Sequence, residues 1–168
     1  MPGAVILLDT SASMATYAGA KRRIDLLDDV LKMVIADAPD ARVIVFNSAA
    51  RELSRLDMEP GRFRLPEPAG STALHLALEL AGRLKPSRVV VISDGEPDFD
   101  ESALTVARLI KVPRIDALYV GSDDDRTALM FMGMLSHCGQ SHGVAGLRSL
   151  EQPDVLAEEI RLLLTGPG

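Results

Sequence analysis

Three short runs of aliphatic residues constrain this chain more than any other feature of its sequence. Residues 4–8 (AVILL), 42–46 (RVIVF) and 88–92 (RVVVI) are almost continuous in aliphatic side chains and show no alternation of polar and apolar positions. Strands of this kind are covered on both faces, as in parallel sheets that lie between helices. Residues 115–120, bounded by a proline and a glycine, form a fourth candidate strand. The sequence therefore predicts a parallel sheet at the centre of the fold.

Segments with a helical spacing of apolar residues alternate with these strands. Helices are predicted over residues 18–37, 73–84, 101–111, 127–137 and 153–164. The more polar run 50–57 is predicted to be an edge strand, and a short strand is expected near Val144. Such alternation implies a three-layer, doubly wound α/β fold of the Rossmann-like kind, with a mostly parallel sheet and helices on both faces. The length of 168 residues fits a single domain spanning residues 1–168.

Composition narrows the classes of function. The net charge of −6 argues against nucleic acid as a partner. The basic cluster Arg51, Arg55, Arg62 and Arg64 is interleaved with acids, so it is interpreted as a solvated edge, with an anion site as the alternative. No apolar run approaches the roughly 20 residues that span a bilayer, so no membrane association is expected. A single cysteine, Cys138, and a start that lacks the pattern of a signal peptide predict a cytoplasmic location.

Polar residues stand where the predicted strands end and where one helix begins. The three segments are 9–13 (DTSAS), 70–72 (GST) and 93–95 (SDG). The carboxyl ends of parallel strands meet at one edge of a sheet, and ligands bind there. A hard cation such as Mg²⁺ takes oxygen ligands, and the two carboxylates and three of the hydroxyls in these segments could supply them. The predicted metal ligands are Asp9, Ser11, Ser13, Thr72 and Asp94.

These three elements together resemble the metal-ion-dependent adhesion site of the von Willebrand factor A domain family, over essentially the whole chain. The resemblance implies that Ser11 and Ser13 coordinate the ion directly and that Thr72 does so directly or through water. It implies that Asp9 and Asp94 act mainly through water. One coordination position would stay open for an acidic side chain of a protein partner. The family fold also implies one short antiparallel edge strand, which suits the polar run identified above.

The resemblance implies a protein–protein interaction module that depends on Mg²⁺, or on Mn²⁺ or Ca²⁺, and not an enzyme. Such a module would serve a multiprotein assembly, including one linked to an ATPase. A Mg²⁺-dependent phosphohydrolase with Asp9 as nucleophile is one alternative, although such enzymes usually carry a second acid where this chain has Ser11. A self-assembling structural protein with the ion between copies is another. The sequence contains no nucleophile elbow, dinucleotide-binding glycine motif or Walker-type loop.

Other reactive residues near these loops have plainer interpretations. Glu96 and Asp98 are expected to be solvated loop residues, although they could compete for the ion. The acids at 123–125 are expected to favour the start of the following helix, with partner contact or a second ion as the alternative. Segment 137–142 (HCGQSH) is expected to end a helix, because its spacing does not suit a four-ligand soft-metal site. His75 lies close enough in sequence to Thr72 for a role at the site.

Overall fold

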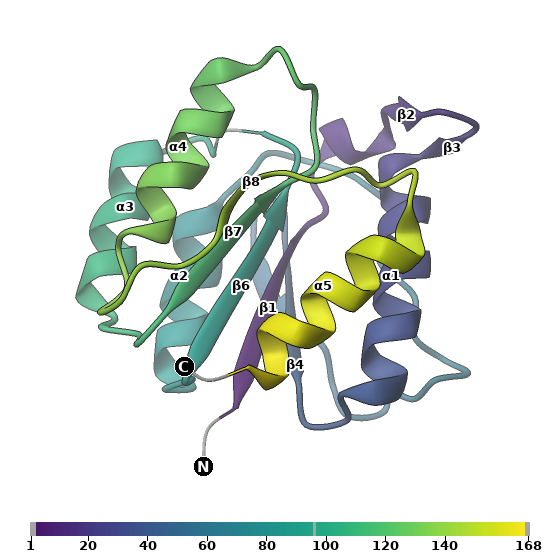
Figure 1. Ribbon diagram of the computed structural model, residues 1–168, viewed down its shortest axis with the longest axis horizontal. Coiled ribbons are helices and arrows are strands. Elements are labelled where there is room, and N and C mark those ends of the chain that lie inside the picture. The colour runs from purple at the N-terminus through teal and green to yellow at the C-terminus, as the bar shows by residue number, and fades with distance from the viewer. Residues whose placement is uncertain (1–2, 96, 167–168) are drawn as a thin grey trace.

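The computed structural model describes residues 3–95 and 97–166, and a six-stranded sheet lies at its centre (Figure 1). The strands are β1 (Ala4–Asp9), β4 (Arg42–Phe46), β5 (Ala50–Glu52), β6 (Arg88–Ser93), β7 (Ile115–Tyr119) and β8 (Ala145–Leu147). Their order is β5-β4-β1-β6-β7-β8. Strand β5 pairs antiparallel with β4, and the other neighbouring strands pair in parallel. The predicted mostly parallel sheet with an antiparallel edge strand is confirmed.

Helices cover both faces of the sheet (Figure 1). They are α1 (Arg23–Asp37), α2 (Leu74–Arg83), α3 (Asp100–Leu109), α4 (Arg126–Ser136) and α5 (Pro153–Thr165). Alternate residues of β1 point to opposite faces, so that Ile6 and Leu8 pack with α1 and α5, while Val5 and Leu7 pack with α2, α3 and α4. This arrangement gives two aliphatic cores on either side of one sheet, which is the predicted three-layer architecture. Among the described residues, no helix is long and apolar enough to cross a membrane.

The chain before α1 differs from the prediction. The helix begins at Arg23, not at residue 18, because a small antiparallel hairpin precedes it. The elements between β1 and α1 are a 3-10 helix η1 (Ala12–Ala15) and the strands β2 (Tyr17–Ala18) and β3 (Lys21–Arg22). Gly19 in the hairpin turn has a φ of 73°, a left-handed conformation that interrupts a helix and that glycine adopts without steric cost. The later start makes Arg23 the first residue of α1, which matters for the site described below.

The antiparallel edge strand is shorter than the predicted 50–57, and it ends at Glu52. A closed turn follows, in which the carboxylate of Asp57 accepts hydrogen bonds from the backbone N–H of Ser54 at 3.1 Å and from its hydroxyl at 2.8 Å. Side chains such as Ser and Asp compete in this way with the hydrogen bonds of a sheet. The other predicted helices and strands lie within a few residues of their observed bounds, including β8 beside Val144.

A buried acid that the sequence analysis did not identify lies in β7. Asp116 is fully buried, and its Oδ1 accepts hydrogen bonds from Arg114 Nε at 2.9 Å and from the backbone N–H of Val144 at 2.7 Å. Arg88 Nε lies 3.8 Å from Asp116 Oδ2. These groups lie near the amino ends of β6 and β7, at the opposite end of the sheet from the predicted metal ligands. They link two central strands by charge within the apolar core.

Candidate metal centre

The loops that follow β1 and β6 lie side by side because these two strands pair directly at the middle of the sheet. The parallel register places Leu8 opposite Ile92, so Asp9 and Asp94 leave the sheet at nearly the same level. The residues are 85 positions apart in sequence, and strand pairing brings them to one edge. The strand ends therefore create the meeting point that the sequence predicted.

The third loop, which precedes α2, is held against the first by backbone hydrogen bonds. Ala12 N donates to Gly70 O at 3.0 Å, and Ala69 N donates to the carbonyl that precedes Ser11 at 3.1 Å. The loop is also joined to the segment after Asp94, because Thr72 N donates to Asp98 Oδ2 at 3.0 Å and Asp98 N donates to Thr72 O at 3.0 Å. All three predicted loops thus form one connected rim.

Four of the five predicted ligands form a continuous hydrogen-bonded network. Asp9 Oδ1 accepts a hydrogen bond from Ser11 N at 2.8 Å. The hydroxyl oxygens of Ser11 and Ser13 are 3.1 Å apart, and the Ser13 hydroxyl donates to Asp94 Oδ1 at 2.7 Å. Thr72 lies on the adjoining loop, where its described hydrogen bonds are made by its backbone. The structure therefore places the predicted residues together, with Thr72 at the margin.

The candidate site has a buried side, here called its floor, which contains Asp9, Ser11 and Asp94, and a side that is open to solvent. Asp9, Ser11 and Asp94 are buried, whereas Thr72 is half-buried and Ser13 is exposed. Gly121, after β7, lies against the floor, since a Cβ at this position would clash with the carbonyl oxygen of Asp94. A ligand from solution can therefore approach beside Ser13 and Thr72.

The electrostatics of the floor favour a cation. Burial, together with the nearby charge of Asp94, raises the pKa of the Asp9 carboxyl from 3.8 to about 6, against the opposing effect of hydrogen bonds from Ser11 and Ser93. The Ser93 hydroxyl donates to Asp9 Oδ2 at 2.7 Å. The sequence analysis included Ser93 in the motif but assigned it no hydrogen bond to Asp9. The two carboxyl groups are close together and shielded from water, so a positive ion between them would relieve the repulsion that raises the pKa of Asp9.

Arg23 is a second residue at the site that sequence reasoning missed. Its Nη1 donates to Asp94 Oδ2 at 2.9 Å, and the side chains of Arg23 and Asp94 are 16% and 0% exposed. A helix over residues 18–37, as predicted, would place Arg23 in its second turn with no reason to assign it to the site. In the structure the helix begins at Arg23, and the side chain of this residue reaches the strand ends. The first turn of α1 thus supplies a positive charge beside the predicted ligands.

The donor set fits a hard, octahedral cation. Adjacent ligands in a Mg²⁺ octahedron with bonds of about 2.1 Å lie about 3.0 Å apart. The hydroxyl oxygens of Ser11 and Ser13 are separated by 3.1 Å, which matches one edge of such an octahedron. Because the Ser13 hydroxyl donates its proton to Asp94, its lone pairs stay available to an ion. Ser11 and Ser13 could therefore hold Mg²⁺ directly while Asp9 and Asp94 balance its charge.

Asp98 and Asp125, two of the acids near the site, each accept a hydrogen bond from the backbone. Asp98 is exposed and accepts the hydrogen bond from Thr72 N described above, and Glu96 lies outside the described residues. Asp125 is the N-cap of α4, and its Oδ1 accepts a hydrogen bond from Ala128 N at 3.0 Å. The interpretation of this acidic run as the start of a helix is confirmed for Asp125.

The histidines also have described neighbours. His137 is the C-cap of α4, as predicted for a helix end, and its ring stacks on that of His142 with centroids 4.1 Å apart. The ring of His75 contacts Phe99 edge to face at 5.5 Å, and its role at the site stays a prediction. Within residues 3–95 and 97–166, no group of three or more His, Cys, Asp or Glu side chains is placed to hold a metal ion.

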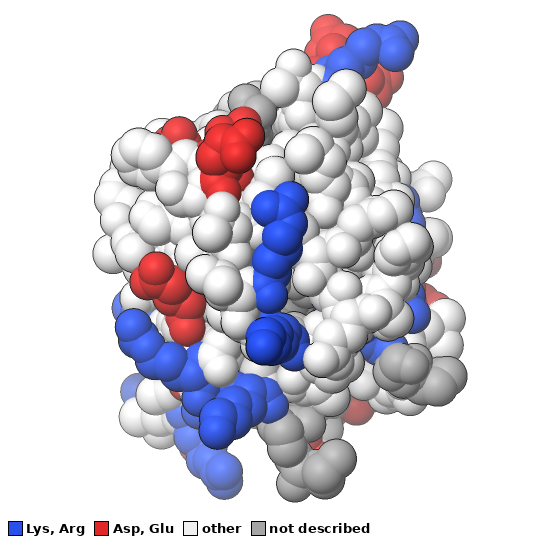
Figure 2. All heavy atoms as spheres, turned by 90° about the vertical axis from the view of Figure 1, so that its left-hand side faces the viewer, with Lys and Arg blue, Asp and Glu red and all other residues white. Residues whose placement is uncertain are grey.

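Exposed basic residues at the carboxyl ends of α2 and α3 lie away from the candidate centre. Figure 2 shows the face that carries α3 and α4, where Lys and Arg side chains gather toward the end at which the strands begin. Exposed basic residues at the carboxyl ends of α2 and α3 are Arg83, Lys85, Arg108 and Lys111. The predicted solvated cluster is exposed as well, at Arg51, Arg55, Arg62 and Arg64. Among the described residues, Arg23 is the basic residue that forms an ion pair with a predicted ligand.

No family model matches the sequence, and no curated protein is similar to it in sequence. Solved structures do share its fold. The conserved hypothetical protein BatB from Bacteroides thetaiotaomicron superposes with a TM-score of 0.62 and 18% identity, covering 99% of this chain and 100% of that one. Manganese-loaded TRAP protein from Plasmodium vivax gives 0.64 and 18%, covering 95% and 73%.

A third similar structure is the pilus adhesin SpaC from Lactobacillus rhamnosus GG in its open conformation, with a TM-score of 0.71 and 14% identity. The match covers 97% of this chain and 30% of the adhesin. Identities this low show the fold and nothing finer. With its six-stranded, mostly parallel sheet, its antiparallel edge strand and helices on both faces, the chain has the α/β fold of the von Willebrand factor A type.

Proposed function

We propose that this chain is a protein-interaction module that holds a divalent cation, Mg²⁺ in the cell, and through it binds an acidic side chain of a partner protein. The ligands are Asp9, Ser11, Ser13, Thr72 and Asp94. The observation that carries the proposal is the network that joins four of them, with two hydroxyl oxygens 3.1 Å apart above two buried carboxylates. The likeness in fold to a manganese-loaded protein and to a pilus adhesin supports it.

The residues take distinct parts in this scheme. Ser11 and Ser13 coordinate the ion directly, and Thr72 does so directly or through water. Asp94 accepts a hydrogen bond from the Ser13 hydroxyl and Asp9 accepts one from Ser11 N, and both carboxylates would bond water on the ion and balance its charge. The ion supplies a compact positive charge that a carboxylate from outside can complete. Such a module would act within a multiprotein assembly, and a cytoplasmic location stays a prediction.

Binding fits the site better than catalysis does. A phosphohydrolase would need Asp9 as a nucleophile, but Asp9 is 0% exposed and both its oxygens accept hydrogen bonds, from Ser11 N and from the Ser93 hydroxyl. Attack on a phosphorus atom requires an accessible lone pair. An assay with p-nitrophenyl phosphate and Mg²⁺ separates the two functions, because turnover that is lost in Asp9→Asn would overturn the binding proposal.

The proposal is tested first by calorimetric titration of Mg²⁺ and Mn²⁺ into the wild-type chain at pH 7.5. We expect about one ion per chain, and no saturable binding by Asp9→Asn, which removes a charge from the floor of the site. Asp124→Asn is the matched control, because it removes the same charge from the exposed rim. Equal affinity in Asp9→Asn and the control would refute the metal site.

The second step tests the open coordination position. Sodium acetate is titrated into the Mn²⁺-loaded chain, with sodium chloride at equal ionic strength as the control, and water-proton relaxation is measured. Acetate that enters the ion's shell displaces water and lowers the relaxation enhancement. An ion that binds but never yields water to acetate would refute the carboxylate-binding part. Mass measured with Mg²⁺ and with chelator tests the alternative, in which a second copy of this chain supplies the acid.

A further inference from the structure

Arg23 holds one of the proposed ligands in place before any ion arrives. Asp94 is clamped from two sides, since its Oδ2 accepts a hydrogen bond from Arg23 Nη1 at 2.9 Å and its Oδ1 accepts one from the Ser13 hydroxyl at 2.7 Å. The Arg23 side chain is 16% exposed and that of Asp94 is fully buried, so this ion pair is poorly screened by solvent.

We propose that Arg23 sets the charge of the metal centre: it competes with the cation for Asp94 and leaves the loaded centre positive, so that the centre selects an anionic partner group. The inference rests on the proposed function. Two carboxylates and one guanidinium together carry one negative charge, and a divalent ion turns this into one positive charge. A single carboxylate from a partner then makes the centre neutral.

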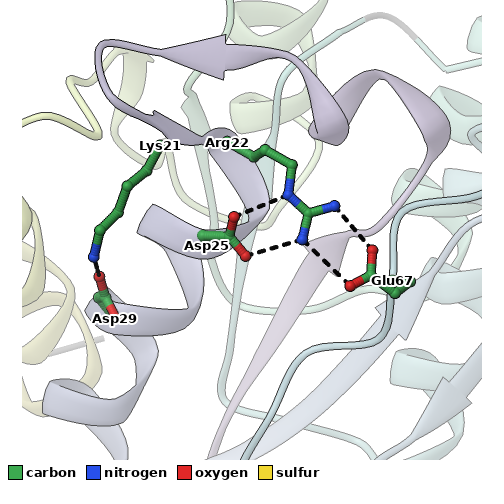
Figure 3. A network of polar contacts seen from close by, with 5 residues as sticks. All are labelled: Lys21, Arg22, Asp25, Asp29 and Glu67. Carbon is green, nitrogen blue, oxygen red and sulfur yellow. Dashed lines mark hydrogen bonds and ion pairs between the residues drawn. The ribbon is translucent and has the colours of Figure 1, made fainter.

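The preceding residue shows that this role depends on position and not on a general need for positive charge. Arg22 points to the other side of the helix start, where its guanidinium bonds Asp25 at 2.9 Å and Glu67 at 2.9 Å (Figure 3). Lys21 likewise pairs with Asp29 at 3.1 Å. These acids are exposed or half-buried, and they belong to a groove of about 590 Å³ beside α1, which holds none of the proposed ligands. Arg22 therefore serves as a control for Arg23 with the same charge.

The test compares Mn²⁺ titrations of the wild type, Arg23→Gln and Arg22→Gln at pH 7.5. Removal of a positive charge beside a divalent ion should tighten binding on the order of tenfold in Arg23→Gln. Arg22→Gln should stay within about twofold of the wild type, because the charge of Arg22 is paired with Asp25 and Glu67 and does not contact a proposed ligand. In chelator, Arg23→Gln should unfold at a lower temperature than the wild type, because Asp94 loses its counter-charge. A purely structural arginine would weaken the metal site when removed, and that result, or equal affinity in the two variants, would overturn the inference.

The selection of an anion is measured on the same variants by the acetate titration. Arg23→Gln should need several times more acetate than the wild type to displace water from Mn²⁺, because its loaded centre is neutral. Arg23→Lys keeps the charge and should stay close to the wild type in both titrations. Unchanged acetate affinity in Arg23→Gln would refute the selection role.

The outcomes separate this inference from the proposed function. Mn²⁺ binding by the wild type without tightening in Arg23→Gln would leave the function standing and refute the role of Arg23. Absence of Mn²⁺ binding in both chains would refute both proposals. If Arg23→Gln does not fold, the wild type itself supplies the test through the side-chain Nε–H NMR signals of its arginines. Addition of Mg²⁺ should shift the signal of Arg23 and leave that of Arg22 in place, and an unmoved Arg23 signal would overturn the inference.

Discussion

Replacement of Asp9 by asparagine should stabilise the metal-free chain while it abolishes metal binding. The structure shows why the substitution is well tolerated sterically. The side-chain oxygen of the asparagine can still accept the hydrogen bond from Ser11 N, and the new amide group can donate to the Ser93 hydroxyl. Ser93 already has an acceptor at Gly95 O, 3.2 Å away, toward which its own proton can turn. The variant therefore keeps the hydrogen bonds and loses only the buried charge.

The size of the effect follows from the pKa of Asp9. Burial, followed by the charge of Asp94, raises this pKa from 3.8 to about 6. A shift of about two units corresponds to about 3 kcal/mol. Because the folded chain binds this proton more tightly than the unfolded chain does, the wild type loses that stability as the pH rises from about 4 to about 6. Above that range Asp9→Asn should be more stable by about 3 kcal/mol, or roughly 6–12 °C in Tm for a chain of this size.

The assay is urea unfolding of both chains in chelator at pH 7.5 and pH 4. The difference in unfolding free energy should favour the variant at pH 7.5 and fall to about 0.5 kcal/mol at pH 4, where Asp9 is protonated in the folded state and about two-fifths protonated in the unfolded state. Saturating Mg²⁺ should then raise the stability of the wild type alone. A variant that is less stable than the wild type at pH 7.5 in chelator would refute the view that the floor of the site is strained by charge.

Three further predictions concern the site and its scaffold. The Mn²⁺ affinity of the wild type should fall about tenfold between pH 8 and pH 5, because protons compete for Asp9 with a pKa of about 6, and a flat profile in calorimetry would contradict this. Thr72→Ala should weaken Mn²⁺ binding severalfold but change the unfolding free energy in chelator by less than about 1 kcal/mol, since Thr72 contacts Asp98 through its backbone. A larger loss of stability would assign Thr72 to the fold. Asp116→Ala should lower the unfolding free energy by about 3–5 kcal/mol, because two arginines lose the buried carboxylate they face. The Mn²⁺ affinity of the folded chain should stay within about twofold of the wild type. Denaturant unfolding checks the first effect and calorimetry the second.

The central strands and the main ligands were predictable because their signals are local. The aliphatic runs identify β1, β4 and β6 whatever surrounds them, and the polar residues from Asp9 and from Ser93 onward mark where β1 and β6 end. The likeness of the motif to a known family then indicated that these ends would meet. The contact of the third loop, by contrast, depends on a backbone bond from Ala12 N to Gly70 O that no local pattern encodes.

The residues that the sequence analysis missed depend on where a helix begins and on how strands distant in sequence pair. Arg23 could not be assigned to the site, because the apolar residues at helical spacing begin at Ile24, and nothing in residues 18–23 (AGAKRR) fixes where the helix starts after the turn at Gly19. Asp116 was overlooked because a single acid within an apolar run has no meaning until the register places Val90 beside it and brings Arg88 within reach. Long-range pairing determines such contacts, whereas local periodicity determines the elements themselves.

The separation of the two carboxylates along the chain has a kinetic consequence. Asp9 and Asp94 come together only when β1 pairs with β6, a contact between distant segments that closes a long loop. An ion that needs both residues therefore has no binding site in the unfolded chain, and it gains one late, once the middle of the sheet has formed. Divalent cations should then slow unfolding and leave the rate of refolding nearly unchanged. The ion would therefore stabilise the folded chain and take no part in the folding nucleus.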